Sequence, residues 1–456
     1  MGMTPTQLRK LDQELSEYLD SMTVGMGRTE RRRALGGYVT GLLLDGERKS
    51  IEPMAARLVE EPDQTEAMRQ RLQQCVSGAS WDDAEMRRRL ALKLQRELPG
   101  LEALVLDDTG FPKKGVHSVG VARQYSGTLG RTDNCQVAVS LHLAGEKGSG
   151  CIAMRLYLPE EWTQDRRRMR TAGVPPEVGF KRKWELALEQ LDDALGWGVR
   201  HHVVLADPGY GNCREFREAL RAKGLHFLMG IQGNTNVWPP DSKPQAPQRV
   251  PHQRGRPRTR YFDASGQSPV LIEQLAAQLP RSAFHRVQWR QGSRGMQSSR
   301  FAALRVRTAE RHMERAAPSE EVWLLVEWPR GEAGPTKYYL SSLPEDTPLK
   351  ELVRMARLRW RVERDYQEMK GEVGLDHFEG RSWRGFHHHA TLCMVAHGFL
   401  ALRRALFPPE EGAVDTAPGA AAAPMLAAAA HRSLPPMPAP DPRSRASSWA
   451  VAHVTG

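Results

Sequence analysis

The most constraining feature of this 456-residue chain is the order of its apolar segments between residues 101 and 231. Short runs rich in Val, Leu and Ala have the pattern of strands, and amphipathic stretches between them have helical spacing. The predicted strands are LEALVLDD, NCQVAVSLHLA, SGCIAMRLYL, HHVVLAD and LHFLMGI. The predicted helices are FKRKWELALEQLDDAL and NCREFREALRAKG. Three strands followed by helix, strand, helix and strand predict a mixed α/β fold.

This order matches a ribonuclease H-like core, which we expect in residues 99–232 and 346–408. The second part contains a predicted long helix at 352–372 and an apolar helix in HHHATLCMVAHGFLALRRAL. Residues 1–98 have helical spacing and predict an N-terminal helical DNA-binding domain. Its clustered basic residues are Arg28, Arg31, Arg32, Arg33, Arg48, Lys49, Arg87, Arg88 and Arg89. For any single arginine of this set, a solvated helix face is the simpler interpretation.

Residues 233–345 predict a β-rich insertion into this core, with strand-like runs such as RFAALRVRT and EVWLLVEW. Between Lys243 and Arg307 there are 13 Lys/Arg residues and 2 Asp/Glu residues, so the excess positive charge concentrates there. Such a segment is a candidate phosphate-contacting surface.

Residues 409–456 are rich in Ala and Pro and predict a disordered tail without catalytic function.

The composition narrows the class of protein. The net charge is +11 and the pI is about 9.6, which favours a polyanionic partner such as nucleic acid. Five cysteines without a CxxC pair argue against a structural zinc site and a disulfide framework. No apolar run reaches 18 residues and the N-terminus lacks secretory-signal features, so we expect a cytoplasmic protein without a membrane span.

Three acidic residues have the context of a catalytic site. Asp107 ends one predicted strand, Asp207 ends another before Pro-Gly, and Glu363 lies within a predicted helix. Crowded carboxylates need cations, and hard oxygen ligands suit Mg²⁺ or Mn²⁺. Two such ions could support phosphodiester chemistry. Each aspartate taken alone is more simply a turn former or helix cap, so the prediction depends on the set.

The helix around Glu363 adds a second pattern. Arg359, Glu363 and Lys370 fall within about 40° of one another on a helical projection, so they share one face. On that face the carboxylate would hold metal while the two cations grip phosphates. The alternative is an exposed helix with an i, i+4 ion pair, worth a few tenths of a kcal/mol.

Three blocks of the sequence resemble the conserved blocks of bacterial insertion-sequence transposases of the DDE superfamily. The blocks are LVLDDTGFPKKGVHSVGVARQYSGTLGRTDNCQVAVSLHLA, VVLADPGYG and RWRVERDYQEMKGEVGLDHFEGRSWRGFHHHATLCMVAHGFL. The similarity is greatest to the branch that has a β-rich insertion and a third block called YREK, and it covers most of residues 30–405.

The resemblance implies that Asp107, Asp207 and Glu363 are the metal-binding triad. Arg359 and Lys370 match the R and K of the third block, whereas its Tyr falls on Ala356; Tyr366 is a candidate substitute. Asp108 adjoins Asp107, and strand alternation lets only one of the two point at the site. We place the first ligand at Asp107.

Further residues are candidates for contacting DNA. Lys113 and Lys114 follow the first acid and could bind phosphates, or could lie on a solvated turn. Trp289 lies near Arg286, Arg290 and Arg294 and could stack on a flipped base, although a core tryptophan is at least as simple an interpretation. Three consecutive histidines at 387–389 point in different directions on a helix, so we interpret them as polar or DNA-facing rather than as a chelate.

The resemblance implies a DNA transposase. It would bind the terminal inverted repeats of its element as a homodimer in a synaptic complex and cut the ends with two Mg²⁺ or Mn²⁺ ions. The 3′-hydroxyl would then be joined to target DNA. Bacterial, nucleoid-associated residence follows from the family. The alternatives are a metal-dependent endonuclease that does not join strands and a non-catalytic domesticated DNA-binding protein.

Overall fold

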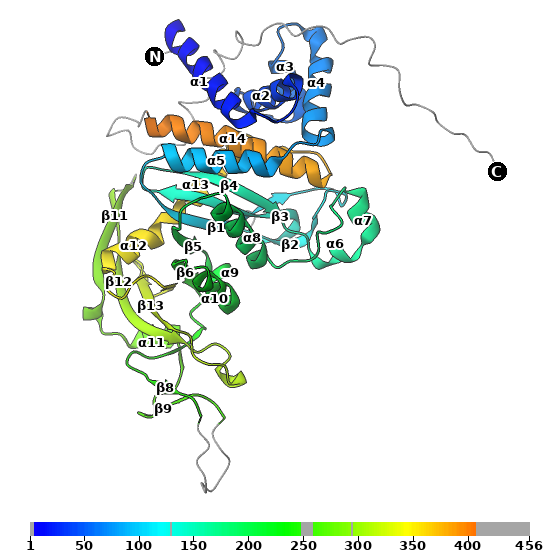
Figure 1. The fold of residues 1–456 in the computed structure, drawn as a ribbon. Helices are drawn as coiled ribbons and strands as arrows, with labels where there is room; N and C mark the ends of the chain where they lie inside the picture. Colours follow the sequence, from blue (N-terminus) through cyan, green and yellow to red (C-terminus); the bar gives the residue numbers. More distant parts are fainter. Residues whose placement is uncertain (1–3, 128–129, 248–258, 293–294, 407–456) are drawn as a thin grey trace, which may run out of the picture.

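The computed structural model describes residues 4–127, 130–247, 259–292 and 295–406. The predicted tail at 409–456 lies outside the described residues. The core strands pair in the order β4-β3-β1-β5-β6, in which β1, β5 and β6 are parallel and the remaining pairs are antiparallel. This is the expected ribonuclease H-like order within a mixed α/β fold (Figure 1). The strand bounds are β1 Leu101–Pro112, β2 Ala122–Ser126, β3 Arg131–Gly145, β4 Gly148–Leu156, β5 Val203–Ala206 and β6 Phe227–Ile231.

The alternation along β1 divides its side chains between two hydrophobic clusters. Leu104 and Leu106 pack with the large cluster that includes the N-terminal helices. Ala103 and Val105 pack with a second cluster, formed with the helices that follow the insertion. Both faces of β1 are therefore covered, which explains its nearly continuous apolar sequence.

The predicted insertion is β-rich and continues the core sheet. Strand β14 pairs antiparallel with β6, so the described strands form one twelve-stranded sheet and a separate β8–β9 pair. Figure 1 shows these strands extending away from the core. Their bounds are β7 Asn236–Trp238, β8 Pro244–Gln245, β9 Phe262–Asp263, β10 Val270–Leu271, β11 His285–Gly292, β12 Gly295–Thr308, β13 Glu321–Trp328 and β14 Lys337–Ser341, with helix α11 at Ile272–Gln278.

The N-terminal residues are helical, as expected, and two helices from opposite ends of the chain cover the sheet together. Helices α5 and α14 lie side by side on it, and the other N-terminal helices pack above them (Figure 1). Helix α5 approaches Gly150 of β4 closely, so a Cβ there would lie 2.8 Å from Leu94 Cδ1 and the leucine side chain would have to shift. The bounds are α1 Pro5–Thr23, α2 Thr29–Leu43, α3 Ile51–Arg57, α4 Thr65–Gln73, α5 Asp83–Glu97 and α14 Trp383–Leu406.

The remaining helices follow β4, β5 and β14 along the chain. They are α6 Glu160–Gln164, α7 Arg166–Thr171, α8 Lys183–Gly196, α9 Pro208–Gly211, α10 Arg214–Ala222, α12 Leu349–Leu358 and α13 Trp360–Gly371. The prediction of one helix over 352–372 is wrong in detail, because α12 and α13 meet at Arg359. Val362 N–H donates to the Arg359 carbonyl, an i, i+3 bond that tightens the helix locally. Within the described residues no helix is both long and apolar enough to cross a membrane.

Candidate active site

The two aspartates are brought together by the register of two parallel strands. Val105 of β1 is paired with Leu205 of β5, and Asp107 and Asp207 each follow two residues later. Neighbouring strands lie about 4.8 Å apart, so the two carboxylates leave the sheet at adjacent positions. Asp207 is also the N-cap of α9, since its carboxylate accepts from Tyr210 N–H at 3.3 Å. The capping and catalytic interpretations of this residue are therefore compatible.

The glutamate reaches the same place from α13, and an arginine joins it to the first acid. Arg359 Nη1 donates to Asp107 Oδ2 at 2.8 Å, and its Nη2 donates to Glu363 Oε1 at 3.0 Å. The Asp107 side chain is 15% exposed, whereas that of Glu363 is 65% exposed. The site thus has a buried acid on the sheet and a solvent-facing acid on the helix, with one guanidinium between them.

Burial and mutual repulsion make the two aspartates poor places for uncompensated negative charge. Burial raises the pKa of the Asp107 carboxyl to about 6; Arg359 acts in the opposite direction, and the charge of Asp207 adds to the increase. Burial and the nearby Asp108 also raise the pKa of Asp207. Perturbed carboxyls of this kind are typical of functional sites.

Asp108 lies on the other face of β1 and has its own cation. Lys183, at the start of α8, donates to Asp108 Oδ2. Asp107 shares the strand face of Val105, which packs with the α12–α13 cluster that also contains Val362. The face that carries Asp107 is therefore the one nearer to Glu363.

The donor set has the chemistry of a site for a hard divalent cation. Carboxylate oxygens suit Mg²⁺ and Mn²⁺, and a cation would relieve the repulsion between Asp107 and Asp207. Across the described residues, no three His, Cys, Asp or Glu side chains are placed to hold a metal ion together. Arg359 supplies positive charge between Asp107 and Glu363 instead.

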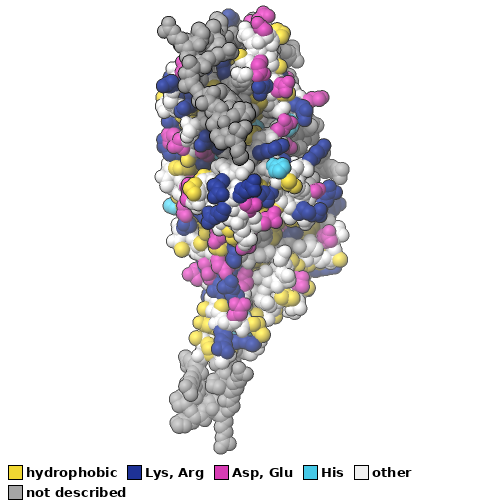
Figure 2. Space-filling view, turned by 90° about the vertical axis from the view of Figure 1, so that its right-hand side faces the viewer, with side chains coloured by type: hydrophobic (Ala, Val, Ile, Leu, Met, Phe, Trp, Pro, Cys, Tyr) yellow, Lys and Arg dark blue, Asp and Glu magenta, His cyan; other side chains and the backbone are white. Residues whose placement is uncertain are grey.

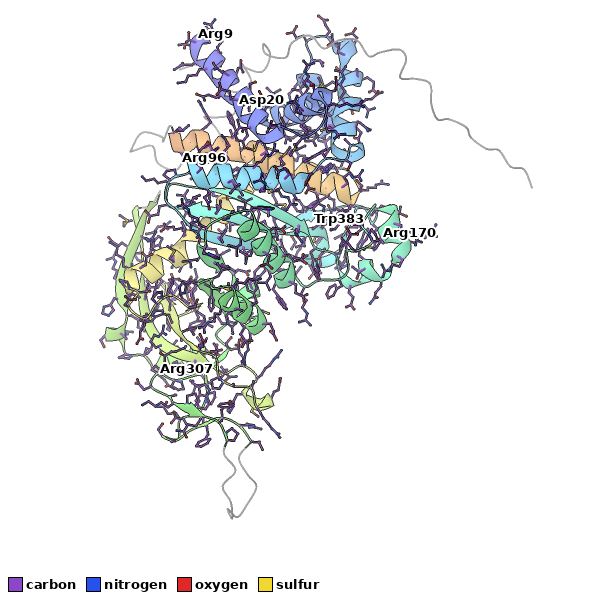
Figure 3. The ribbon with its side chains drawn as sticks, viewed as in Figure 1. Arg9, Asp20, Arg96, Arg170, Arg307 and Trp383 are labelled. Atoms are coloured by element: carbon purple, nitrogen blue, oxygen red, sulfur yellow. The ribbon has the colours of Figure 1, made fainter. Side chains whose placement is uncertain are left out.

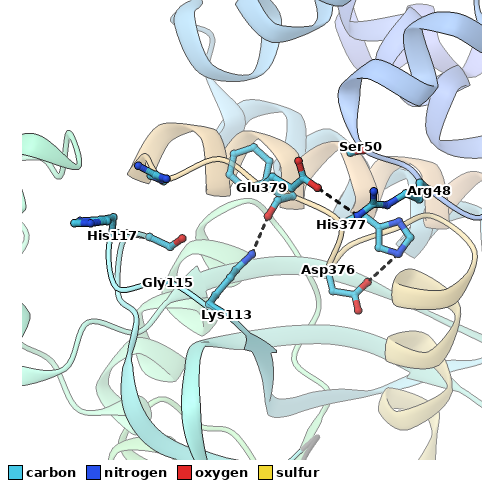
Figure 4. Close-up of a pocket in the computed structure, with 11 residues that line it drawn as sticks. Arg48, Ser50, Lys113, Gly115, His117, Asp376, His377 and Glu379 are labelled. Atoms are coloured by element: carbon cyan, nitrogen blue, oxygen red, sulfur yellow. Dashed lines mark hydrogen bonds and ion pairs between the residues drawn. The ribbon is translucent and has the colours of Figure 1, made fainter.

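Two of the candidate lysines, Lys113 and Lys114, directly follow β1, and the third, Lys370, contacts β1 from α13. Lys370 Nζ donates to the Gly110 carbonyl at 2.9 Å, and burial lowers its pKa. Lys113 Nζ donates to the Phe378 carbonyl at 2.8 Å and lines a cavity of about 350 Å³ (Figure 4). Lys114 is exposed. Lys370 and Lys113 therefore tie β1 to the segments that follow Glu363.

The structure packs Trp289 against the protein. The Arg357 guanidinium of α12 lies 4.2 Å from the Trp289 ring centre, and the Phe301 ring stands edge-on at 5.9 Å. Arg286 is exposed and donates to Ser298 Oγ at 3.2 Å. Arg290 belongs to β11, but its side chain, like all of residue 294, lies outside the described part of the chain. Trp289 is half-buried and packs against the second hydrophobic cluster, so both the packing and the base-stacking interpretations stay predictions.

A buried polar network beneath Asp107 escaped the sequence analysis. On β3, Ser140 Oγ lies 2.8 Å from His142 Nε2, and His142 Nδ1 lies 2.7 Å from Asp365 Oδ2 on α13. The Tyr366 hydroxyl closes the loop at 2.5 Å from Ser140 Oγ. Ser140 is the register partner of Asp107. The signal was present as a serine and a histidine two positions apart in the otherwise apolar second half of the strand, VAVSLHLAG, and therefore on one face of it.

A DNA-facing position is wrong for two of the three histidines, His388 and His389. His388 stacks on Trp81 with ring centres 3.9 Å apart, and His389 Nδ1 lies 2.9 Å from the Tyr38 hydroxyl. Both histidines are buried, because this part of α14 is sandwiched between the sheet and the N-terminal helices.

The fold and these acids define a DDE-type nuclease core, and sequence comparison agrees. The chain belongs to the DDE superfamily endonuclease family, whose profile matches residues 18–296. It is also 30% identical over 199 residues to a probable transposase for insertion sequence element IS701 from Microchaete diplosiphon. That match spans 43% of this chain and 48% of the relative, so the chain matches about half of the relative's length. Glu363 follows the profile match, so its assignment depends on the structure.

Proposed function

We propose that this enzyme is a DNA transposase that cuts the ends of an insertion sequence and joins the 3′-hydroxyl to target DNA. The observation that carries the proposal is the convergence of Asp107 and Asp207 by strand register, with Glu363 joined to Asp107 through Arg359. Membership of the endonuclease family and the similarity to a probable transposase support this reaction class.

Asp107, Asp207 and Glu363 would hold two Mg²⁺ or Mn²⁺ ions. Such ions activate the attacking oxygen and stabilise the leaving oxygen of a phosphodiester. Arg359 lies between two of the acids and can transfer its donors to a phosphate once metal neutralises them. Lys370 holds β1 at Gly110 and adds positive charge beside the path of the strand being cut.

We further propose that the partner is double-stranded DNA, as terminal inverted repeats and as target, and that a homodimer forms the synaptic complex. The N-terminal helices (1–98) and the basic insertion (233–345) would position the DNA on the core. Work on chromosomal DNA would place the enzyme at the bacterial nucleoid. An endonuclease that does not join strands is the second candidate, and only strand-transfer products separate the two.

The test is cleavage and joining of plasmid DNA that carries the native ends, with Mg²⁺ or Mn²⁺. Wild type is compared with alanine variants of Asp107, Asp108, Asp207 and Glu363. We expect only wild type and Asp108→Ala to cut and join. Cutting without joining would support the endonuclease. End binding without cutting by any of the proteins would support a non-catalytic binder.

A further inference from the structure

A compact basic surface lies at the end of the core sheet away from the insertion. Two segments that meet there, 113–123 and 165–171, contain seven Lys/Arg residues and one acid, Asp165. Figure 2 looks at this end of the molecule and shows Lys and Arg side chains gathered across the middle of the face. These segments carry seven positive charges against one negative charge, and the exposed Glu160 and Glu161 of the adjoining α6 lie outside them.

Helix α7 is built so that most of its arginines remain available. Asp165 accepts from Arg168 N–H at 2.9 Å and so serves as the helix cap. The Arg168 guanidinium lies 3.7 Å from the Trp162 ring centre and donates to the Val116 carbonyl at 2.8 Å, which fixes α7 to the 113–123 segment. The only acid and one of the four arginines are thus used for structure.

The other arginines face solvent. Arg166, Arg167 and Arg170 are exposed and form no ion pair within the part of the chain that the structure describes. Figure 3 shows Arg170 pointing outward from this end of the molecule. Exposed cations without acidic partners keep their full charge available for phosphates.

The cavity around Lys113 continues this surface toward the N-terminal helices. Its rim carries His117, Arg381 and Arg48, and Arg48 is 3.7 Å from Glu379 in an exposed ion pair (Figure 4). An exposed pair of this kind contributes little to stability, so a phosphate can replace Glu379 at low cost.

The distance from the site sets where DNA would meet this surface. Lys113 comes six positions after Asp107 along β1 and its continuation. This corresponds to about 20 Å at roughly 3.4 Å per residue. A DNA strand rises about 3.4 Å per nucleotide, so this length corresponds to about six nucleotides. Resting on the proposed function, we infer that the surface formed by residues 113–123 and 165–171 binds the DNA backbone about six nucleotides from the scissile phosphate.

The test measures the salt dependence of end binding for Arg167→Gln/Arg170→Gln against a matched control, Lys147→Gln/Arg200→Gln. The control removes the same charge from exposed positions in the turn between β3 and β4 and in the segment before β5, outside the proposed DNA-binding parts. The slope of log K against log salt should fall by about 1.8 for the α7 variant, because two phosphate contacts are lost, and should not change for the control. The test is repeated with duplexes shortened to three base pairs on one side of the cut or on the other. Shortening should abolish the difference in slope between wild type and the α7 variant on one side of the cut only.

Each outcome bears on the inference. Equal slopes for wild type and the α7 variant would overturn it, as would an equal loss in the control, which would indicate a general charge effect. If wild type does not bind end DNA at all, the proposed function fails instead.

A second inference comes from the polar network of Ser140, His142, Asp365 and Tyr366. These side chains join α13, which carries Glu363, to β3 directly beside Asp107, and three of the links are 2.5–2.8 Å long. Ser149 of β4 donates to the second Asp365 oxygen at 2.6 Å. Hydrogen bonds are directional, so they restrict rotation and sliding of the helix more than apolar packing does.

We propose that this network positions Glu363 relative to Asp107, and therefore sets metal affinity. The bonds that define the network join its members to one another and not to the three proposed metal ligands, so we treat these members as positioning residues. Loss of comparable supporting contacts around metal sites typically lowers affinity 10–100-fold.

The test compares Tyr366→Phe with Tyr38→Phe. Each change removes one buried tyrosine hydroxyl bonded to a neighbouring side chain, but Tyr38 bonds His389 among the N-terminal helices. We expect about tenfold weaker Mn²⁺ binding to DNA-free Tyr366→Phe by electron paramagnetic resonance, and unchanged binding to Tyr38→Phe. Excess Mn²⁺ should restore the cleavage rate of Tyr366→Phe.

Unchanged Mn²⁺ affinity of Tyr366→Phe would refute the positioning role, and so would an equal loss in Tyr38→Phe. Absence of Mn²⁺ binding by wild type would contradict the metal assignment itself, and this inference with it.

Discussion

Replacing Asp107 by Asn should stabilise the protein while destroying its activity. Folding raises the pKa of this carboxyl from 3.8 to about 6, chiefly through burial. The folded state therefore binds a proton more tightly than the unfolded state, and stability is lost as pH rises from 3.8 through 6. At about 1.4 kcal/mol per pKa unit, the ionised Asp107 costs up to about 3 kcal/mol at pH 8, of which about 2 kcal/mol develops above pH 4.

The assay is urea denaturation of wild type and Asp107→Asn in EDTA at several pH values from 4 to 8. Asparagine does not titrate, so the stability of the variant relative to wild type should rise with pH by about 2 kcal/mol. Added Mn²⁺ should then stabilise wild type and not the variant, because the ligand stabilises only the form that binds it.

Asp108→Asn is the control, since it loses an ion pair with Lys183 and should be less stable than wild type. The reasoning is refuted if the difference between Asp107→Asn and wild type does not change with pH, or if it falls as pH rises. Either result would mean that Arg359 compensates the charge of Asp107 fully in the folded state.

Three further predictions concern the helix and the insertion. Glu363→Gln should abolish cleavage in a plasmid assay and keep end binding in a gel-shift assay, because the side chain is exposed and its amide cannot serve as an anionic ligand; retained cleavage would exclude Glu363 as the third ligand. Asp365→Ala should lower the free energy of unfolding by about 3–5 kcal/mol in urea, because it leaves buried His142 without its anion; a loss below 1 kcal/mol would contradict this. Trp289→Ala should lower the free energy of unfolding in urea by about 2 kcal/mol in the absence of DNA. A tryptophan used only for base stacking would instead change DNA binding and leave the free energy of unfolding unchanged.

The sequence predicted only part of what places the two aspartates. Asp207 directly follows strand β5, as expected, whereas the prediction that Asp107 ends its strand is wrong, because β1 continues to Pro112. The spacing of Arg359 and Glu363 predicted a shared helix face, on which the structure places an ion pair. Such local periodicities depend on backbone geometry alone, so they can be read without a fold.

Other features depend on which surfaces come to face each other, and the sequence does not state them. His388 and His389 are polar residues on an apolar helix, and only the packing of α14 between two layers shows that their partners, Trp81 and Tyr38, come from the N-terminal helices. The network around Asp365 depends in the same way on the pairing of α13 with β3. Contacts between residues more than 200 positions apart leave no local periodicity to read.

The pairing of β14 with β6 explains how a long insertion can separate Asp207 from Glu363 without disturbing the site. Strand β6 is the last core strand before residues 233–345, and Ile231 at its end is paired with Tyr338 near the end of the insertion. The chain therefore returns to the sheet beside the point where it left. From there α12 packs on the second cluster of β1 and β5, and α13 carries Glu363, which Arg359 links to Asp107. The antiparallel β6–β14 pair thus returns the chain to the core sheet and sets no length for the segment between these two strands.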